Sequence, residues 1–263
     1  MSTNSSQLDR PVHVSLGSYG RTSHLLAIAD MLAYPPTEPL LGMLSTERVQ
    51  ICPQNHGMFD VEVARDVKRL LPQIEWRLHA NVRVDPVYRW ADIVDWPQQK
   101  NYFAALARVS QVLAAPAYSA HAGRRDRATV DAVLNNAREL ENLFGVPVAI
   151  EGHYPTPGDI WLFSTWAEYQ RLLESSAHYA LDLSHLHILA SRTGVTELGL
   201  VREMLACERC IEVHLSSNDG RADQHRPLLE KPWWFSLLAG VHPDATIFSE
   251  GKQWLRQPQA VAA

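Results

Sequence analysis

The feature that most constrains this chain is the alternation of short apolar runs with longer stretches of helical period. The apolar runs are rich in β-branched residues, and apolar residues between them recur at the spacing of amphipathic helices. Repeated strand and helix units of this kind build a parallel sheet covered by helices. We predict eight strands, at 12–17, 48–53, 75–82, 111–119, 147–152, 179–183, 210–215 and 245–249. The helices predicted between them lie at 24–32, 61–71, 101–109, 129–144, 165–174, 195–205 and 232–238.

Eight such units in 263 residues match the usual size of one complete (β/α)8 TIM barrel. The sequence shows no linker, low-complexity tract or charge block that would divide it. We therefore predict a single α/β TIM-barrel domain at 11–256, with a flexible N-terminus at 1–10 and a flexible tail at 257–263.

Charge and cysteine content indicate which kinds of partner the chain can bind and in which cellular compartment it is expected. A formal net charge of -5 gives no general basic field, so a nucleic-acid partner is not expected. Three cysteines, Cys52, Cys207 and Cys210, are too few for a disulfide framework and fit a reducing compartment. There is no apolar signal region at the N-terminus and no run of eighteen apolar residues, so we expect a cytoplasmic protein without a membrane segment.

Residues of metal-ligand type stand at or just after the ends of six successive predicted strands. In a parallel barrel these strand ends converge on one mouth, where the active sites of this fold are found. A carboxylate such as Glu151, placed after the apolar strand residues Val148 and Ile150, would be costly to bury without a partner or a metal. The set comprises nine residues: His79, His121, Glu151, Asp182, His185, His214, Asp223, His225 and Glu250.

Nine ligands exceed the number that one ion takes, whereas carboxylates can bridge ions, so we expect two or three metal ions. A shell of histidines and carboxylates without cysteine suits iron, zinc or manganese. The alternative for each single residue is a helix cap, an ion pair or a buried polar network.

The order His, His, Glu, Asp-x-x-His, His, Asp-x-His, Glu resembles the trinuclear metal signature of the endonuclease IV and xylose-isomerase-like barrel superfamily. The resemblance implies that Glu151 bridges two ions. It places His79 and His121 on the first ion, and Asp182, His214 and Glu250 on the second. The third ion would be held by His185, Asp223 and His225.

The segment HLSSNDGRADQH, followed by PWW, is also similar to that of the multinuclear iron enzymes typified by the methanobactin biosynthesis oxidase. This narrower resemblance favours iron and implies oxidative modification of a thiol-containing small molecule or peptide in a biosynthetic pathway. It also allows for a peptide-presenting partner protein. The alternatives are a zinc or manganese phosphodiester hydrolase, a sugar isomerase or epimerase, and a non-catalytic metal-binding protein.

Four further residues are candidates for contact with substrate. His153 and His187 each lie two residues beyond a predicted ligand, where a histidine can act as a general acid or base or serve a structural role. Asn218 and Arg221 lie in the predicted loop between His214 and Asp223, a position that suits substrate binding.

Overall fold

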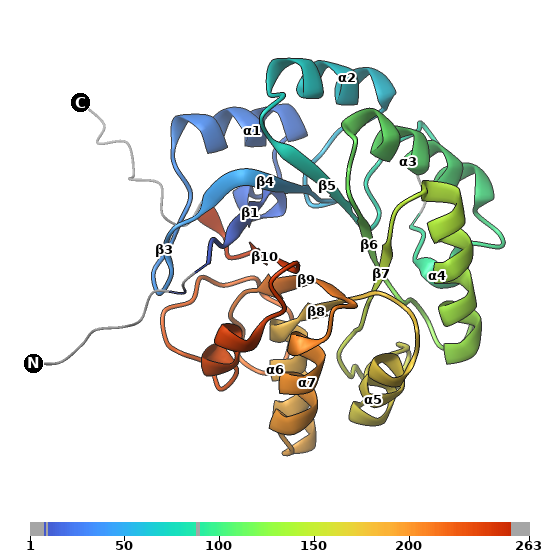
Figure 1. Ribbon diagram of the computed structural model, residues 1–263, viewed down its shortest axis with the longest axis vertical. Helices are drawn as coiled ribbons and strands as arrows, with labels where there is room; N and C mark the ends of the chain where they lie inside the picture. The colour runs from blue at the N-terminus through green and yellow to red at the C-terminus, as the bar shows by residue number, and fades with distance from the viewer. Residues whose placement is uncertain (1–7, 9, 88–89, 254–263) are drawn as a thin grey trace, which may run out of the picture.

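A computed structural model describes residues 8, 10–87 and 90–253 of the chain. Its strands form a closed parallel barrel in the order β1-β10-β9-β8-β7-β6-β5-β4, and the helices lie around the outside (Figure 1). The eight-unit TIM barrel predicted from the sequence is thereby confirmed. The barrel strands are β1 (His13–Ser15), β4 (Ser45–Ile51), β5 (Glu75–His79), β6 (Tyr118–His121), β7 (Val148–Glu151), β8 (Tyr179–Asp182), β9 (Cys210–Leu215) and β10 (Thr246–Ser249).

The outer layer contains seven α-helices in the part of the chain that the structure describes, together with short 3-10 helices and a small hairpin. The α-helices are α1 (His24–Ala33), α2 (Val61–Leu70), α3 (Lys100–Leu113), α4 (Val130–Phe144), α5 (Trp166–Glu174), α6 (Leu183–Thr193) and α7 (Leu198–Ala206). The 3-10 helices are η1 (Leu16–Tyr19), η2 (Ile93–Asp95) and η3 (Phe235–Gly240), and the hairpin pairs β2 (Thr37–Glu38) with β3 (Gly42–Met43).

Local sequence explains where these helices begin and end. The Thr129 side chain accepts a hydrogen bond from the backbone N–H of Ala132 and so caps α4. Gly145 ends the same helix in the left-handed conformation, at φ 72°, which glycine adopts without steric cost. The helix predicted at 129–144 is therefore confirmed almost to the residue.

Two predicted elements are wrong in their extent or type, and one helix lies where none is predicted. The strand predicted at 111–119 begins late, because α3 continues to Leu113 and ends at Ala114 in the left-handed conformation. The helix predicted at 232–238 is the short 3-10 helix η3, which starts at Phe235. Helix α6 was not predicted at all, although it begins directly after β8.

The predicted flexible ends lie largely outside the described residues, which omit 1–7, 9 and 254–263. None of the described helices is both long enough and apolar enough to cross a membrane.

The barrel register brings the ligand-type residues to one level. His79 is the register partner of Ser119, His121 of Glu151, and Asp182 of His214. Because the strands are parallel, all these carboxyl ends open at the same end of the barrel.

Candidate metal centre

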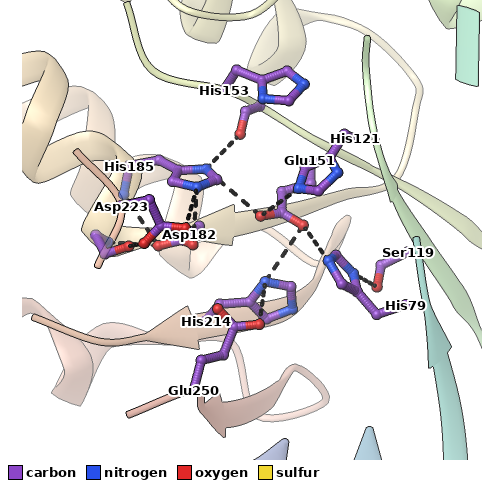
Figure 2. Close-up of polar contacts among 12 residues, drawn as sticks. His79, Ser119, His121, Glu151, His153, Asp182, His185, His214, Asp223 and Glu250 are labelled. Atoms are coloured by element: carbon purple, nitrogen blue, oxygen red, sulfur yellow. Dashed lines mark hydrogen bonds and ion pairs between the residues drawn. The ribbon is translucent and has the colours of Figure 1, made fainter. Parts of the chain in front are cut away.

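A cavity of about 250 Å³ opens at the carboxyl ends of the strands. The described residues that line it include eight of the nine predicted ligands, and the ninth, His214, is fully buried beside them. Figure 2 shows the side chains that it labels converging on Glu151 from strand ends, from α6 and from the loop after β9. The lining consists of Gln54, His79, Trp90, His121, Glu151, His153, Tyr154, Trp161, Asp182, His185, Asp223, His225 and Glu250.

Glu151, at the end of β7, lies at the centre of the cluster. One carboxylate oxygen, Oε2, is 3.3 Å from Nε2 of His79 and 3.5 Å from Nδ1 of His214. The other oxygen, Oε1, is 3.7 Å from Nδ1 of His185 and 3.9 Å from Nε2 of His121. Each oxygen of this buried carboxylate therefore faces its own pair of imidazoles (Figure 2).

Asp182 and His185 are held in place by the start of α6. The Asp182 side chain accepts hydrogen bonds from the backbone N–H groups of Ser184 and His185 and so caps the helix. The His185 Nδ1–H donates to the carbonyl of Gly152 at 2.9 Å, which turns Nε2 toward Asp182 at 3.4 Å and Asp223 at 3.6 Å.

Glu250, after β10, joins the two sides of the cluster. Its Oε1 is 3.9 Å from Nδ1 of His214, and its Oε2 is 3.4 Å from Nε2 of His225. His225 in turn lies 2.9 Å from Asp223.

Among the described residues, three groups have ligand atoms within 4.8 Å of one another, which is the spacing needed around a single ion. They are His79, Glu151 and His214; Glu151, Asp182 and His185; and Asp182, His214 and Glu250. The third group is the second ligand set that the superfamily resemblance implies. The first group places His79 with His214, whereas the resemblance places it with His121. The roles of all nine residues as ligands stay predictions.

Electrostatics at the cavity are dominated by four carboxylates, and none of the described residues that line it is lysine or arginine. Burial lowers the pKa of His185, but the negative charges of Asp182 and Asp223 more than offset burial and raise the pKa to about 10. Burial likewise opposes protonation of His214 and His225, yet the neighbouring carboxylates raise the pKa of each well above its usual range. The carboxylates of the metal-free site therefore favour protonation of these three histidines.

Several polar atoms at the centre of the cluster are buried without a hydrogen-bond partner, which also fits metal binding. Within the described part of the chain, Oε2 of Glu151 and Nδ1 of both His121 and His214 are buried without a hydrogen-bond partner. Buried polar atoms are rarely left without a partner, because each such atom costs about 1–3 kcal/mol. Oε2 of Glu151 and Nδ1 of His214 face each other across the cluster, so a divalent ion there would satisfy both.

The predicted substrate-contact residues divide into two groups. His153 lines the cavity, stacked between Trp161 at 4.4 Å and His121 at 4.8 Å between ring centroids. The described residues that line the cavity do not include His187, Asn218 or Arg221.

These three side chains lie around the loop that follows β9. The Asn218 amide donates to the carbonyl of Ser184 and accepts from the backbone N–H of Gly220, so it holds the loop in place. His187 is near Gly220 and is half-buried. A role for any of the three in substrate binding stays a prediction.

Residues that the sequence interpretation passed over also belong to this site. Asp92 is buried, accepts hydrogen bonds from Asn81 and Trp90, and places Oδ1 3.8 Å from Nδ1 of His121. Nothing in its local sequence marks it, since it lies in the long segment between β5 and α3. Glu212 is different: it lies two residues before His214, and the period of two along a strand turns both side chains into the barrel.

No protein-family model and no curated protein matches this chain. Solved structures resemble it over nearly its whole length. A D-tagatose 3-epimerase-like protein is 13% identical, with 93% of this chain and 91% of that protein covered and a TM-score of 0.63. The IolI protein with a binding zinc atom is 11% identical, with 91% and 88% covered and a TM-score of 0.61. Endonuclease IV from Thermus thermophilus is 16% identical, with 90% of each chain covered and a TM-score of 0.52.

At these identities the likeness shows the fold, a TIM barrel of the xylose-isomerase-like kind. None of these three is a methanobactin biosynthesis enzyme, so the narrower resemblance stays a prediction.

Proposed function

We propose that this chain is a multinuclear, metal-dependent hydrolase of a small phosphate ester. The observation that carries the proposal is the position of Glu151, whose two oxygens each face a separate pair of histidines at 3.3–3.9 Å. Among the described residues, a carboxylate in this position belongs to two groups of ligand type, one with His79 and His214 and the other with Asp182 and His185. When bound there, divalent ions supply Lewis-acid chemistry that activates water and neutralises phosphate oxygens.

Sugar epimerisation is the second candidate function, because epimerases are among the structures of similar fold. Epimerisation needs a base that is free to take a proton from a sugar carbon. Both oxygens of Glu151 face histidines, and so do both oxygens of Glu250, which lie 3.9 Å from His214 and 3.4 Å from His225. Oε2 of Glu151 nevertheless has no hydrogen-bond partner among the described residues, so these contacts do not separate the two reactions, and the assay below does.

His153 supplies the base that hydrolysis requires. Its Nε2 is buried and has no hydrogen-bond partner among the described residues, and burial holds its pKa well below the usual range, so the ring is neutral. A neutral imidazole on the cavity wall can accept a proton from the attacking water at Nε2. Stacking against His121 and Trp161 fixes the plane of the ring.

The size of the cavity indicates a small substrate. A volume of about 250 Å³ lies just below the usual range for ligand pockets, which begins at about 300 Å³. Tyr154, Trp161 and the half-exposed Trp90 give it an aromatic wall around the polar floor. This wall suits the organic part of a small ester, while the floor suits its phosphate.

The test is reconstitution of metal-free protein with Zn²⁺, Mn²⁺ or anaerobic Fe²⁺. Each form is assayed for hydrolysis of p-nitrophenyl phosphate and bis-p-nitrophenyl phosphate, for epimerisation of free ketoses, and for oxygen uptake with thiols and cysteine peptides. We expect ester hydrolysis with zinc or manganese. Ketose epimerisation without hydrolysis would refute the proposal.

The iron-dependent oxidative reaction, with its thiol or peptide substrate and partner protein, stays a prediction based on the motif after His214. Oxygen uptake by the iron form alone would support it and would overturn the hydrolase.

A further inference from the structure

A buried polar layer lies directly beneath the candidate metal centre, inside the barrel. Its central residue is Glu212 on β9, which is completely buried and is not among the described residues that line the cavity. Around it lie Arg77 from β5, Ser119 from β6 and Gln50 from β4. A TIM-barrel interior is usually filled by branched apolar side chains. A charged layer inside this barrel is therefore unusual and needs a structural or functional explanation.

Glu212 contacts both the interior and the metal-facing histidines. Its Oε1 accepts a hydrogen bond from Nη1 of Arg77 at 3.2 Å. Its Oε2 accepts from the Ser119 hydroxyl at 2.7 Å and lies 3.2 Å from Nε2 of His214. The Ser119 oxygen is also 3.0 Å from Nδ1 of His79 (Figure 2).

Donor and acceptor chemistry fixes where the protons lie. A carboxylate can only accept, so Nε2 of His214 must carry the proton that it shares with Glu212. The Ser119 hydroxyl has a single hydrogen, and this hydrogen points to Glu212. The Ser119 oxygen must therefore accept from Nδ1–H of His79. The Gln50 amide nitrogen is placed 2.9 Å from Nε2 of His214, and two N–H groups cannot share one hydrogen bond. With a proton on Nε2 of His214, the Gln50 amide takes the opposite orientation, in which its oxygen faces the ring and accepts that proton.

We propose that Glu212 is a positioning residue for the metal centre: it fixes His214 directly, and His79 through Ser119, so that both imidazoles present a lone pair to the same point. The lone pairs are those of Nδ1 of His214 and Nε2 of His79, which lie 3.5 Å and 3.3 Å from the same oxygen of Glu151. The two rings stand edge to face at 85°, with centroids 5.1 Å apart. This inference rests on the proposed metal-dependent function.

The barrel register makes this arrangement possible. His79 on β5 is the register partner of Ser119 on β6, so the first contact crosses one strand boundary. Glu212 and His214 share the inward face of β9. Arg77, two residues before His79, neutralises Glu212 and is itself held by Glu75 at 3.1 Å. Glu212 thus orients His79 on β5 and His214 on β9, although these two strands are not adjacent in the barrel.

Partners of this kind around a metal ligand typically change metal affinity by about 10–100-fold when they are removed. The test is Glu212→Gln in the full-length protein, titrated with Zn²⁺ and with Co²⁺, whose visible absorption reports the geometry of its ligands. We expect affinity to fall by about 10–100-fold and the cobalt spectrum to change.

The matched control is Glu168→Gln. Glu168 is also buried and paired with an arginine, Arg125 at 2.7 Å, but it lies outside the cavity lining. We expect this variant to keep both the affinity and the cobalt spectrum. If Glu212→Gln does not fold, as judged by circular dichroism, Ser119→Ala decides the question with the same two measurements, because it removes the hydroxyl that links Glu212 to His79 and leaves the contact between Glu212 and His214 in place.

The possible failures are distinguishable. A wild-type protein that binds neither Zn²⁺ nor Co²⁺ would overturn the proposed function and this inference together. A wild type that binds both, with a folded Glu212→Gln variant of unchanged affinity and unchanged spectrum, would overturn the positioning role alone.

Discussion

Metal binding should release protons from the protein, and this prediction follows from the charge of the cavity. In the metal-free protein, nearby carboxylates raise the pKa of His185 to about 10 and those of His214 and His225 well above the usual range. A histidine that binds a metal ion must give up the proton on the ligating nitrogen. Each of these rings therefore exchanges a proton for a metal when the site fills.

The size of the effect can be worked out from the same groups. At pH 8 His185, whose pKa is about 10, carries the extra proton, and the raised pKa values of His214 and His225 favour the protonated form of each, so filling the site should release at least one proton. Affinity rises tenfold per pH unit for each proton released, so the overall affinity should rise at least tenfold per pH unit. Below this range Asp182, whose pKa burial raises to about 6, begins to compete for protons. Above it, His185 loses its proton without help from a metal.

Isothermal titration calorimetry with Zn²⁺, in two buffers of different ionisation enthalpy, measures the number of protons released. His225→Asn should lower that number by about one, and the control Glu168→Gln should leave it unchanged. A proton release near zero at pH 8 would show that the histidines are neutral in the metal-free protein and would refute the reasoning.

Two substitutions test the positions around the centre. Glu151→Gln should lose most of the bound metal, because a neutral amide bridges two cations poorly, and elemental analysis of the purified variant measures the loss; full metal stoichiometry would remove Glu151 from the ligand set. Gly152→Ala should destabilise the fold by about 1–3 kcal/mol, because a Cβ at this position would lie 2.4 Å from the Tyr169 hydroxyl. Urea unfolding measures this change, and a variant as stable as the wild type would show that Tyr169 moves aside at no cost.

The sequence sufficed to predict the fold and the level at which the candidate ligands meet. Both depend on strong signals: the apolar strand runs, and the rule that parallel strands end at one mouth. The sequence alone could not predict that His79 lies beside His214, because this pairing depends on side-chain directions across the barrel rather than on positions along one strand.

Other parts of the site could be predicted only in part. Glu212 carries a readable signal, its spacing of two from His214, whereas Asp92 reaches the site from a long irregular segment with no periodicity. Helix α6 is absent from the prediction because Asp182 both ends β8 and caps the helix. No turn separates the two elements, and the residues after Asp182 were interpreted as a ligand motif rather than as the start of a helix.

The arrangement of charge connects the polar layer with the metal centre. Within the described barrel interior, Arg77 neutralises Glu212 beneath the cavity, and no lysine or arginine lines the cavity above. The carboxylates of the cavity, Glu151 among them, must therefore be balanced either by protons on histidines or by bound cations. Because Glu212 accepts the proton on Nε2 of His214, Nδ1 is the nitrogen that faces the carboxylates, and the same hydrogen bond raises the pKa of that ring. The polar layer thus makes Nδ1 of His214 more basic, which strengthens its binding of a proton and of a metal ion alike.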